Sequence, residues 1–270
     1  MAEPTLIDSH CHLNYEYTPK STDDLVREAT ESGVSHMVTI GTEIATLQAT
    51  SEIAEKYANV YFTAGVHPHE SETMKDEDIA VLEKFARHKK CRAIGEIGLD
   101  YYYKHSAREP QIKRLRDQLD LALKVGQPIV VHSREAEEDL LPELTMYAKS
   151  FPQGEKNKDG TPRPIGAIHC FTGTRAFGEA CMNLGFLISF SGILTFKSAT
   201  DLQECARAFP LEKLMVETDS PYLAPIPMRG KKCEPAMVRY TAVKLAELKG
   251  VTLDEVARVT SANAKAMFRI

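Results

Sequence analysis

The first stretch of the chain that could do chemistry is an Asp-x-His-x-His pattern near the N-terminus. Asp8, His10 and His12 lie in the apolar run from Leu6 to Leu13. If this run is a buried strand, its side chains alternate between two faces, and the three polar side chains point the same way. Two neutral imidazoles on one face are half of a site for zinc, manganese, cobalt or nickel. The alternative is a pair of histidines without a ligand, one hydrogen-bonded and one solvated.

The elements that must position these histidines are short apolar runs that alternate with helical patterns. The runs predict eight strands, at residues 6–13, 36–40, 60–66, 92–96, 128–132, 165–169, 186–190 and 214–217. The segments between them carry apolar residues at helical spacing, and the closing helices are predicted at 235–249 and 252–268. This order predicts an α/β fold, a single-domain (β/α)8 TIM barrel over residues 1–270. A doubly wound open sheet is the alternative, but the glycine-rich turn that it needs is absent.

Polar side chains stand at the carboxyl ends of the predicted strands. They are His10, His12, His67, Glu96, His132, His169 and Asp219. In a TIM barrel these ends meet at one face, where active sites are built. Five of the nine histidines belong to this set, a clustering that unrelated core histidines would not produce. Taken singly, His67 before Pro68 and Asp219 before Ser220 could also be turn residues.

Glu96 lies in the apolar, glycine-rich run 93–100, so its carboxylate is expected to be buried. A buried carboxylate needs a cation or a proton to offset its lost hydration. Four imidazoles and two carboxylates exceed what one tetrahedral metal needs, and they fit two divalent ions, Zn, Mn or Mg, bridged by Glu96. Two metals about 3.5–4 Å apart suit phosphoester hydrolysis.

Residues next to these candidates divide between the two strand faces. Asp8 and Glu217 share the inward face with ligand candidates, so they are expected either to orient ligands or to bond backbone at the barrel rim. Cys11 and Cys170 alternate outward toward the helices, and thiolate ligation is not expected there.

Composition limits the other possibilities. The net charge of −5 argues against a broad basic face for nucleic acid, so any polyanion site must be local. Six cysteines without a CxxC pair indicate a reduced, cytoplasmic protein. The chain shows no signal-peptide pattern and no apolar run near the ~20 residues of a membrane span. The polar segment 152–164 predicts a surface loop.

Six motifs spread over nearly the whole chain resemble those of the TatD family of metal-dependent deoxyribonucleases, within the amidohydrolase-like barrels. They lie at residues 7–13, 64–69, 93–101, 128–136, 169–173 and 217–223. The resemblance implies one metal on His10, His12 and Asp219, a second on His132 and His169, and a bridging Glu96. It also implies that His67 contacts the phosphate or the leaving group.

The resemblance implies a hydrolase acting on ester bonds. Its activity is expected to be that of a 3′-to-5′ exodeoxyribonuclease on single-stranded DNA, and some members of the family also act on RNA. In this hypothesis a metal-activated water attacks phosphorus, and the catalytic residues are Asp219, Glu96 and His67. We expect a monomer that does not bind membranes. One alternative is a metal-dependent hydrolase of a small ester or amide, but many such barrels use a carbamylated lysine where this chain has Glu96. A second alternative is a barrel whose metals are structural and whose function is to bind a partner.

Basic and aromatic residues near the strand ends fit a polyanion. Arg134, Arg229 and Lys231 are predicted to bind substrate, because loops at this face of a barrel commonly hold phosphate. The run Tyr101–Tyr103 could stack on a base or pack the barrel mouth. Cys233 stands where the family frequently has Asn, which leaves fine substrate preference open.

Overall fold

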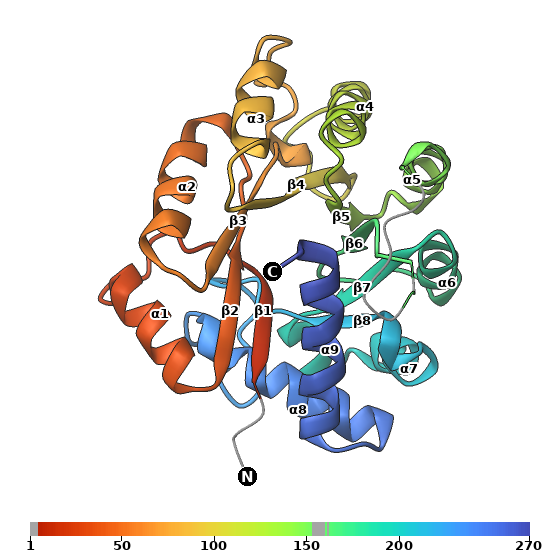
Figure 1. Ribbon diagram of the computed structural model, residues 1–270. Coiled ribbons are helices and arrows are strands. Elements are labelled where there is room, and N and C mark those ends of the chain that lie inside the picture. Colours follow the sequence, from red (N-terminus) through yellow and green to blue (C-terminus); the bar gives the residue numbers. More distant parts are fainter. Residues whose placement is uncertain (1–4, 153–159, 161) are drawn as a thin grey trace.

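The computed structural model describes residues 5–152, 160 and 162–270, and within them eight parallel strands follow one another around a barrel (Figure 1). The strands are β1 (Leu6–Cys11), β2 (Val34–Thr39), β3 (Val60–Ala64), β4 (Cys91–Asp100), β5 (Ile129–Arg134), β6 (Gly166–Ile168), β7 (Phe186–Phe190) and β8 (Leu214–Val216). The chain after β8 meets β1, since Asp219 N–H donates to the His10 carbonyl and His12 N–H to the Ser220 carbonyl. The predicted TIM barrel is therefore confirmed.

Helices surround the strands on the outside (Figure 1). They are α1 (Thr22–Glu31), α2 (Leu47–Lys56), α3 (Asp78–Ala86), α4 (Arg108–Val125), α5 (Glu137–Ser150), α6 (Arg175–Asn183), α7 (Thr200–Ala208), α8 (Val238–Lys249) and α9 (Leu253–Phe268). Local sequence explains several ends: Ser21 and Asp24 form a capping box on α1, and Gly126 ends α4 in a left-handed conformation. In the described part of the chain, no helix is long and apolar enough to cross a membrane.

The barrel interior is filled by apolar side chains from alternate strand positions. Ile7, Val38, Ala93 and Val130 belong to this cluster. Phe268 at the end of α9 packs against the same cluster, and Figure 1 shows α9 lying across one end of the barrel with the C-terminus near its axis. This end is sealed, so chemistry is confined to the opposite mouth, where the strands end.

Most predicted strand bounds agree with the structure within two or three residues, and β4 is the exception. It runs to Asp100, four residues beyond its predicted end. Gly98 makes this possible: it has φ +145°, and a Cβ there would overlap the carbonyl oxygen of His132 on β5. The glycine allows the two strands to approach each other where the site is built. The loop predicted at 152–164 lies mostly outside the described residues.

Candidate metal centre

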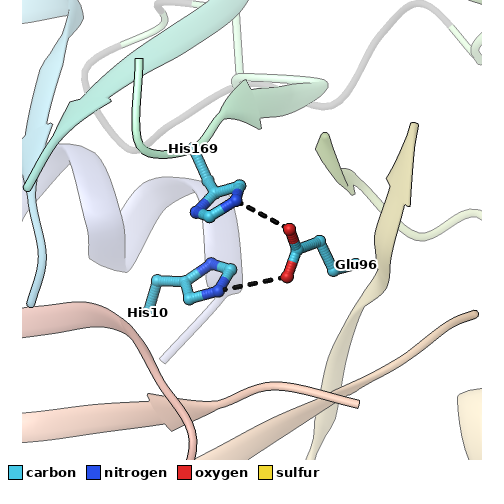
Figure 2. A group of neighbouring side chains, drawn as sticks. All are labelled: His10, Glu96 and His169. Atoms are coloured by element: carbon cyan, nitrogen blue, oxygen red, sulfur yellow. Dashed lines mark ion pairs between the residues drawn. The ribbon is translucent and has the colours of Figure 1, made fainter. Parts of the chain in front are cut away.

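Glu96 is the central residue of the barrel mouth. Its Oε2 lies 3.4 Å from Nε2 of His10, and its Oε1 lies 2.7 Å from Nε2 of His169 (Figure 2). Oε1 is also 3.0 Å from Nδ1 of His132. Both oxygens of one buried carboxylate thus contact imidazoles from different strands, which is the arrangement that a bridging ligand requires.

Asp219 completes a second group of donors beside the first. Its Oδ1 lies 3.4 Å from Nε2 of His12 and 3.6 Å from Nε2 of His10. The segment after β8 positions Asp219, which adopts a left-handed φ of 56°. Nε2 of His10 therefore lies between Glu96 on one side and Asp219 on the other.

Three overlapping groups of side chains could hold a metal, each with its donor atoms within 4.8 Å of one another. They are His10–Glu96–His169, His10–His12–Asp219 and His67–Glu96–His132. The donor set fits a metal on a further ground: both ring nitrogens of His10 and Nε2 of His169 are buried and form no aligned hydrogen bond, although oxygens of Glu96 lie close to the two Nε2 atoms. Leaving such an atom unsatisfied costs about 1–3 kcal/mol, which coordination would offset.

Two of the histidines contact a second carboxylate through the ring nitrogen that does not face the centre. Nε2 of His132 lies 2.9 Å from Oδ2 of Asp100, which leaves Nδ1 facing Glu96. Burial opposes protonation of this ring, but the contacts with Asp100 and Glu96 raise its pKa. Nδ1 of His169 lies 3.2 Å from Oε1 of Glu217, which leaves Nε2 for the centre. Carboxylate–histidine pairs of this kind are typical of metal ligands.

His67 differs from the other histidines of the site because it offers an N–H group. Its Nδ1 accepts the backbone N–H of His69 at 3.1 Å, so the neutral ring carries its proton on Nε2. That Nε2 lies 3.3 Å from Oε1 of Glu96. Burial lowers the pKa of His67 to about 4, which keeps the ring neutral. His67 therefore offers an N–H donor rather than a lone pair, although it belongs to one of the three groups.

The charges of the centre follow from burial and mutual contact. Burial alone would raise the pKa of Glu96, but His169 and His67 hold it well below its usual range. Burial lowers the pKa of His10, so its imidazole is neutral. Burial also opposes ionisation of Asp219, yet the contact with His12 lowers its pKa. Burial opposes protonation of His169, but Glu96 and Glu217 raise its pKa well above the usual range. Metal binding there would release a proton, because divalent ions bind neutral imidazoles and ionised carboxylates.

A cavity of about 480 Å3 opens above these residues. Its walls include His67, His132, Asp219, Arg134 and Tyr103. The predicted substrate residue Arg134 is thus at the site.

The structure does not bring the other two predicted basic residues to this cavity. The Arg229 guanidinium lies 4.1 Å from the ring centroid of Phe196, and it packs there instead of facing the metal centre. Lys231 is exposed, after Gly230 turns the loop with a φ of 85°. These contacts are made between loops far apart in sequence, so spacing along the chain did not reveal them.

The two inward carboxylates predicted beside the ligands have different partners. Glu217 contacts a ligand, His169, and accepts the Cys170 N–H at 2.6 Å. Asp8 accepts the backbone N–H of Thr218 at 2.9 Å and its hydroxyl at 2.6 Å, and burial raises the pKa of Asp8 to about 8. Asp8 thus ties β1 to the end of β8 and contacts no imidazole ring.

The expectation that Cys170 faces the helices is wrong. Cys170 lines the mouth cavity, with Sγ 3.2 Å from Oγ of Ser191. Its φ of 41° ends the alternation of β6, so the side chain does not follow the parity of the strand. Burial raises the pKa of its thiol well above the usual range, which is consistent with a thiol rather than a thiolate ligand.

Sequence reasoning missed Asp100 and His69. Asp100 is fully buried, and its Oδ2 lies 3.0 Å from Nε2 of His69 as well as near His132. The signal was present, because Asp100 is four residues after Glu96 and a strand period of two places both on one face. The predicted strand ended at Glu96 and therefore excluded it.

Comparisons with known proteins identify the family of this chain. A model of the TatD related DNase family matches residues 7–269. The uncharacterized metal-dependent hydrolase YabD of Bacillus subtilis is 37% identical over 98% of this chain and 99% of its own. The 3′-5′ ssDNA/RNA exonuclease TatD of Erwinia amylovora is 32% identical over 97% of this chain and 99% of its own.

Solved structures give the same result. The crystal structure of YjjV, a TatD homologue from Escherichia coli, superposes with a TM-score of 0.87 at 28% identity and covers 98% of both chains. The TatD family protein from Entamoeba histolytica superposes with a TM-score of 0.82 over 98% of both chains. With the family model matched almost from end to end, this chain belongs to the TatD family of metal-dependent hydrolases.

Proposed function

We propose that this hydrolase removes nucleotides from the 3′ end of single-stranded DNA, and of RNA, with two divalent ions at its centre. The observation that carries the proposal is Glu96, whose Oε2 faces His10 and whose Oε1 faces His169 and His132. The exonuclease activity in the name of the Erwinia amylovora relative supports the choice of substrate. The cavity of about 480 Å3 is the size of a small-ligand site and suits a strand end better than a duplex.

The two donor groups divide the ligands between the ions. His10, His12 and Asp219 would hold the first, His132 and His169 would hold the second, and Glu96 would contact both. When bound, the ions activate a water near neutral pH and stabilise negative charge on the phosphoryl oxygens.

The chain's own side chains contact the substrate and the water. His67, which is neutral and carries its proton on Nε2, donates a hydrogen bond to the phosphate or to the leaving oxygen. Asp219, with a side chain 14% exposed at the cavity wall, orients the attacking water and accepts its proton. The donor and the acceptor thus come from opposite parts of the barrel, after β3 and after β8.

The test is metal-free protein reconstituted with Zn, Mn or Mg in turn. A single strand labelled at its 5′ end is expected to shorten one nucleotide at a time, and the same strand labelled at its 3′ end is expected to lose the label at once. A panel of small esters and amides runs in parallel. Hydrolysis of the panel without hydrolysis of the strands would overturn the nuclease proposal, and a 3′ label that is released last would overturn its direction.

A further inference from the structure

We propose that Tyr103 and Arg134 form a nucleotide subsite at the mouth of the metal centre. A base of the single strand stacks on the Tyr103 ring, and a phosphate of the same strand pairs with the Arg134 guanidinium. We call this pair of residues the Tyr103–Arg134 shelf. The inference rests on the proposed nuclease function and assigns the contact that holds the strand beside the ions.

The three consecutive tyrosines have different environments. The Tyr101 hydroxyl donates to Oδ2 of Asp139 at 2.6 Å, so Tyr101 is part of the structure. Tyr102 and Tyr103 are 51% and 43% exposed, although large aromatic side chains are usually buried. Of the three, Tyr103 is the one that lines the mouth cavity. An exposed ring at the edge of a substrate cavity is available for stacking.

The Arg134 side chain is held by aromatic faces rather than by a carboxylate. Its guanidinium carbon lies 4.3 Å from the ring centroid of Tyr102 and 5.1 Å from that of Tyr103. The two rings meet at 85°, so the guanidinium lies in the corner between them. Among the residues that the structure describes, Arg134 makes no ion pair, whereas Arg108 pairs with Asp139. Its charge remains available to an anion in the cavity.

One carboxylate connects the shelf to the metal centre. Oδ1 of Asp100 accepts the backbone N–H groups of Tyr102 at 3.0 Å and Tyr103 at 2.9 Å. Oδ2 of Asp100 lies 2.9 Å from Nε2 of His132. The tyrosine backbone is therefore fixed with respect to a metal ligand, and the subsite is organised before the strand binds.

These features together favour a polynucleotide over a small ester. A tyrosine face stacks on any base, and a guanidinium forms charge-assisted hydrogen bonds to phosphate. A base and a phosphate joined through one sugar occur in each unit of a nucleotide chain. A small ester confined to the metal centre would leave the shelf without a contact.

The experiment pairs a protein change with a substrate change. An oligonucleotide with all its bases is compared with the same strand carrying abasic positions at its last three nucleotides, so that the phosphates stay identical. On the intact strand, Tyr103→Ala is expected to lower kcat/KM between about 5- and 150-fold, mainly through KM, because one stacked base is lost. On the abasic strand the loss is expected to shrink by about 5-fold or more, because the variant and the substrate then lack the same contact.

Arg134→Gln tests the phosphate half of the shelf. The slope of log KM against log salt concentration is expected to fall by about 0.7, the value for one phosphate contact on a single strand. Tyr240→Ala and Arg258→Gln serve as matched controls on α8 and α9, since neither residue lines the cavity.

The outcomes separate the two proposals. If the wild-type protein hydrolyses neither strand, the nuclease function fails. If it hydrolyses both, but Tyr103→Ala costs the same on the intact and abasic strands, the stacking contact is overturned while the function stands. An unchanged salt slope in Arg134→Gln would overturn the phosphate contact in the same way.

Discussion

Asp100 holds His132 by one nitrogen and leaves the other for the metal centre. Nε2 of His132 lies 2.9 Å from Oδ2 of Asp100, and Nδ1 lies 3.0 Å from Oε1 of Glu96. The imidazole thus lies between two buried carboxylates, Asp100 and Glu96, and these two contacts fix the orientation of the ring.

Replacing this carboxylate tests its positioning role. We expect Asp100→Asn to weaken metal affinity about 10- to 100-fold, as changes of such outer partners typically do. Competition with a chelator measures the affinity, and activity should recover when the metal concentration is raised. Asp76→Asn, at a carboxylate that is 78% exposed, is the matched control. An Asp100→Asn variant with wild-type metal affinity would show that Asp100 is merely structural.

Much of the fold and of the site was predictable because each signal was local. Apolar runs predict strands, and a polar residue at the end of a run predicts a side chain at the barrel mouth. The structure places Glu96 and His169 there, as predicted. The extension of β4 to Asp100 was not predictable in this way, because glycines weaken a strand pattern and Gly98 is used for its close contact with β5. Arg229 was misplaced for a different reason: its packing on Phe196 depends on two loops that only the fold brings together.

The bridging role of Glu96 is tested by two substitutions of different shape. Glu96→Ala should lower activity by about 10³-fold or more while leaving the fold largely intact, since the ions supply several kcal/mol of transition-state stabilisation. Glu96→Gln keeps the volume but offers one carbonyl oxygen, so we expect the metal content to fall from two ions per chain to one. Atomic-emission analysis of dialysed protein counts the ions. Full metal-dependent activity in Glu96→Ala would refute the bridge.

We assign His67 as a hydrogen-bond donor and not as a metal ligand. We expect His67→Ala to lower kcat about 10²- to 10³-fold, the range for loss of one hydrogen-bond donor to developing negative charge, with the metal content unchanged. A loss of one ion in this variant would instead make His67 a ligand. His88→Ala is the control, because His88 pairs with Glu55 away from the mouth.

Gly98 should be far less replaceable than Gly126, another glycine with a positive φ. Gly126 has φ 66° with open space around it, so Gly126→Ala is expected to cost about 1 kcal/mol, the strain of a left-handed residue. Gly98→Ala adds a clash with the carbonyl of His132 and is expected to cost about 3 kcal/mol or more. Urea unfolding measures both, and equal costs would show that β4 and β5 can separate freely. Because the clash is at a ligand, metal affinity should also fall in Gly98→Ala alone.

Removal of metal should destabilise the whole barrel. Glu96 and Asp219 both lie beside His10 in a buried mouth. Without a cation, two carboxylate charges stay close together, and the buried ring nitrogens of His10 have no aligned hydrogen bond. Metal at 1,000 times its dissociation constant stabilises the folded protein by about 4.1 kcal/mol per ion, which corresponds to a rise in Tm of about 2 °C or more per kcal/mol. Calorimetry of metal-free and reloaded protein gives this shift. In Glu96→Ala the shift should shrink sharply, because the bridge is gone; a shift as large as that of the wild type would mean that the stabilising ion binds outside the mouth.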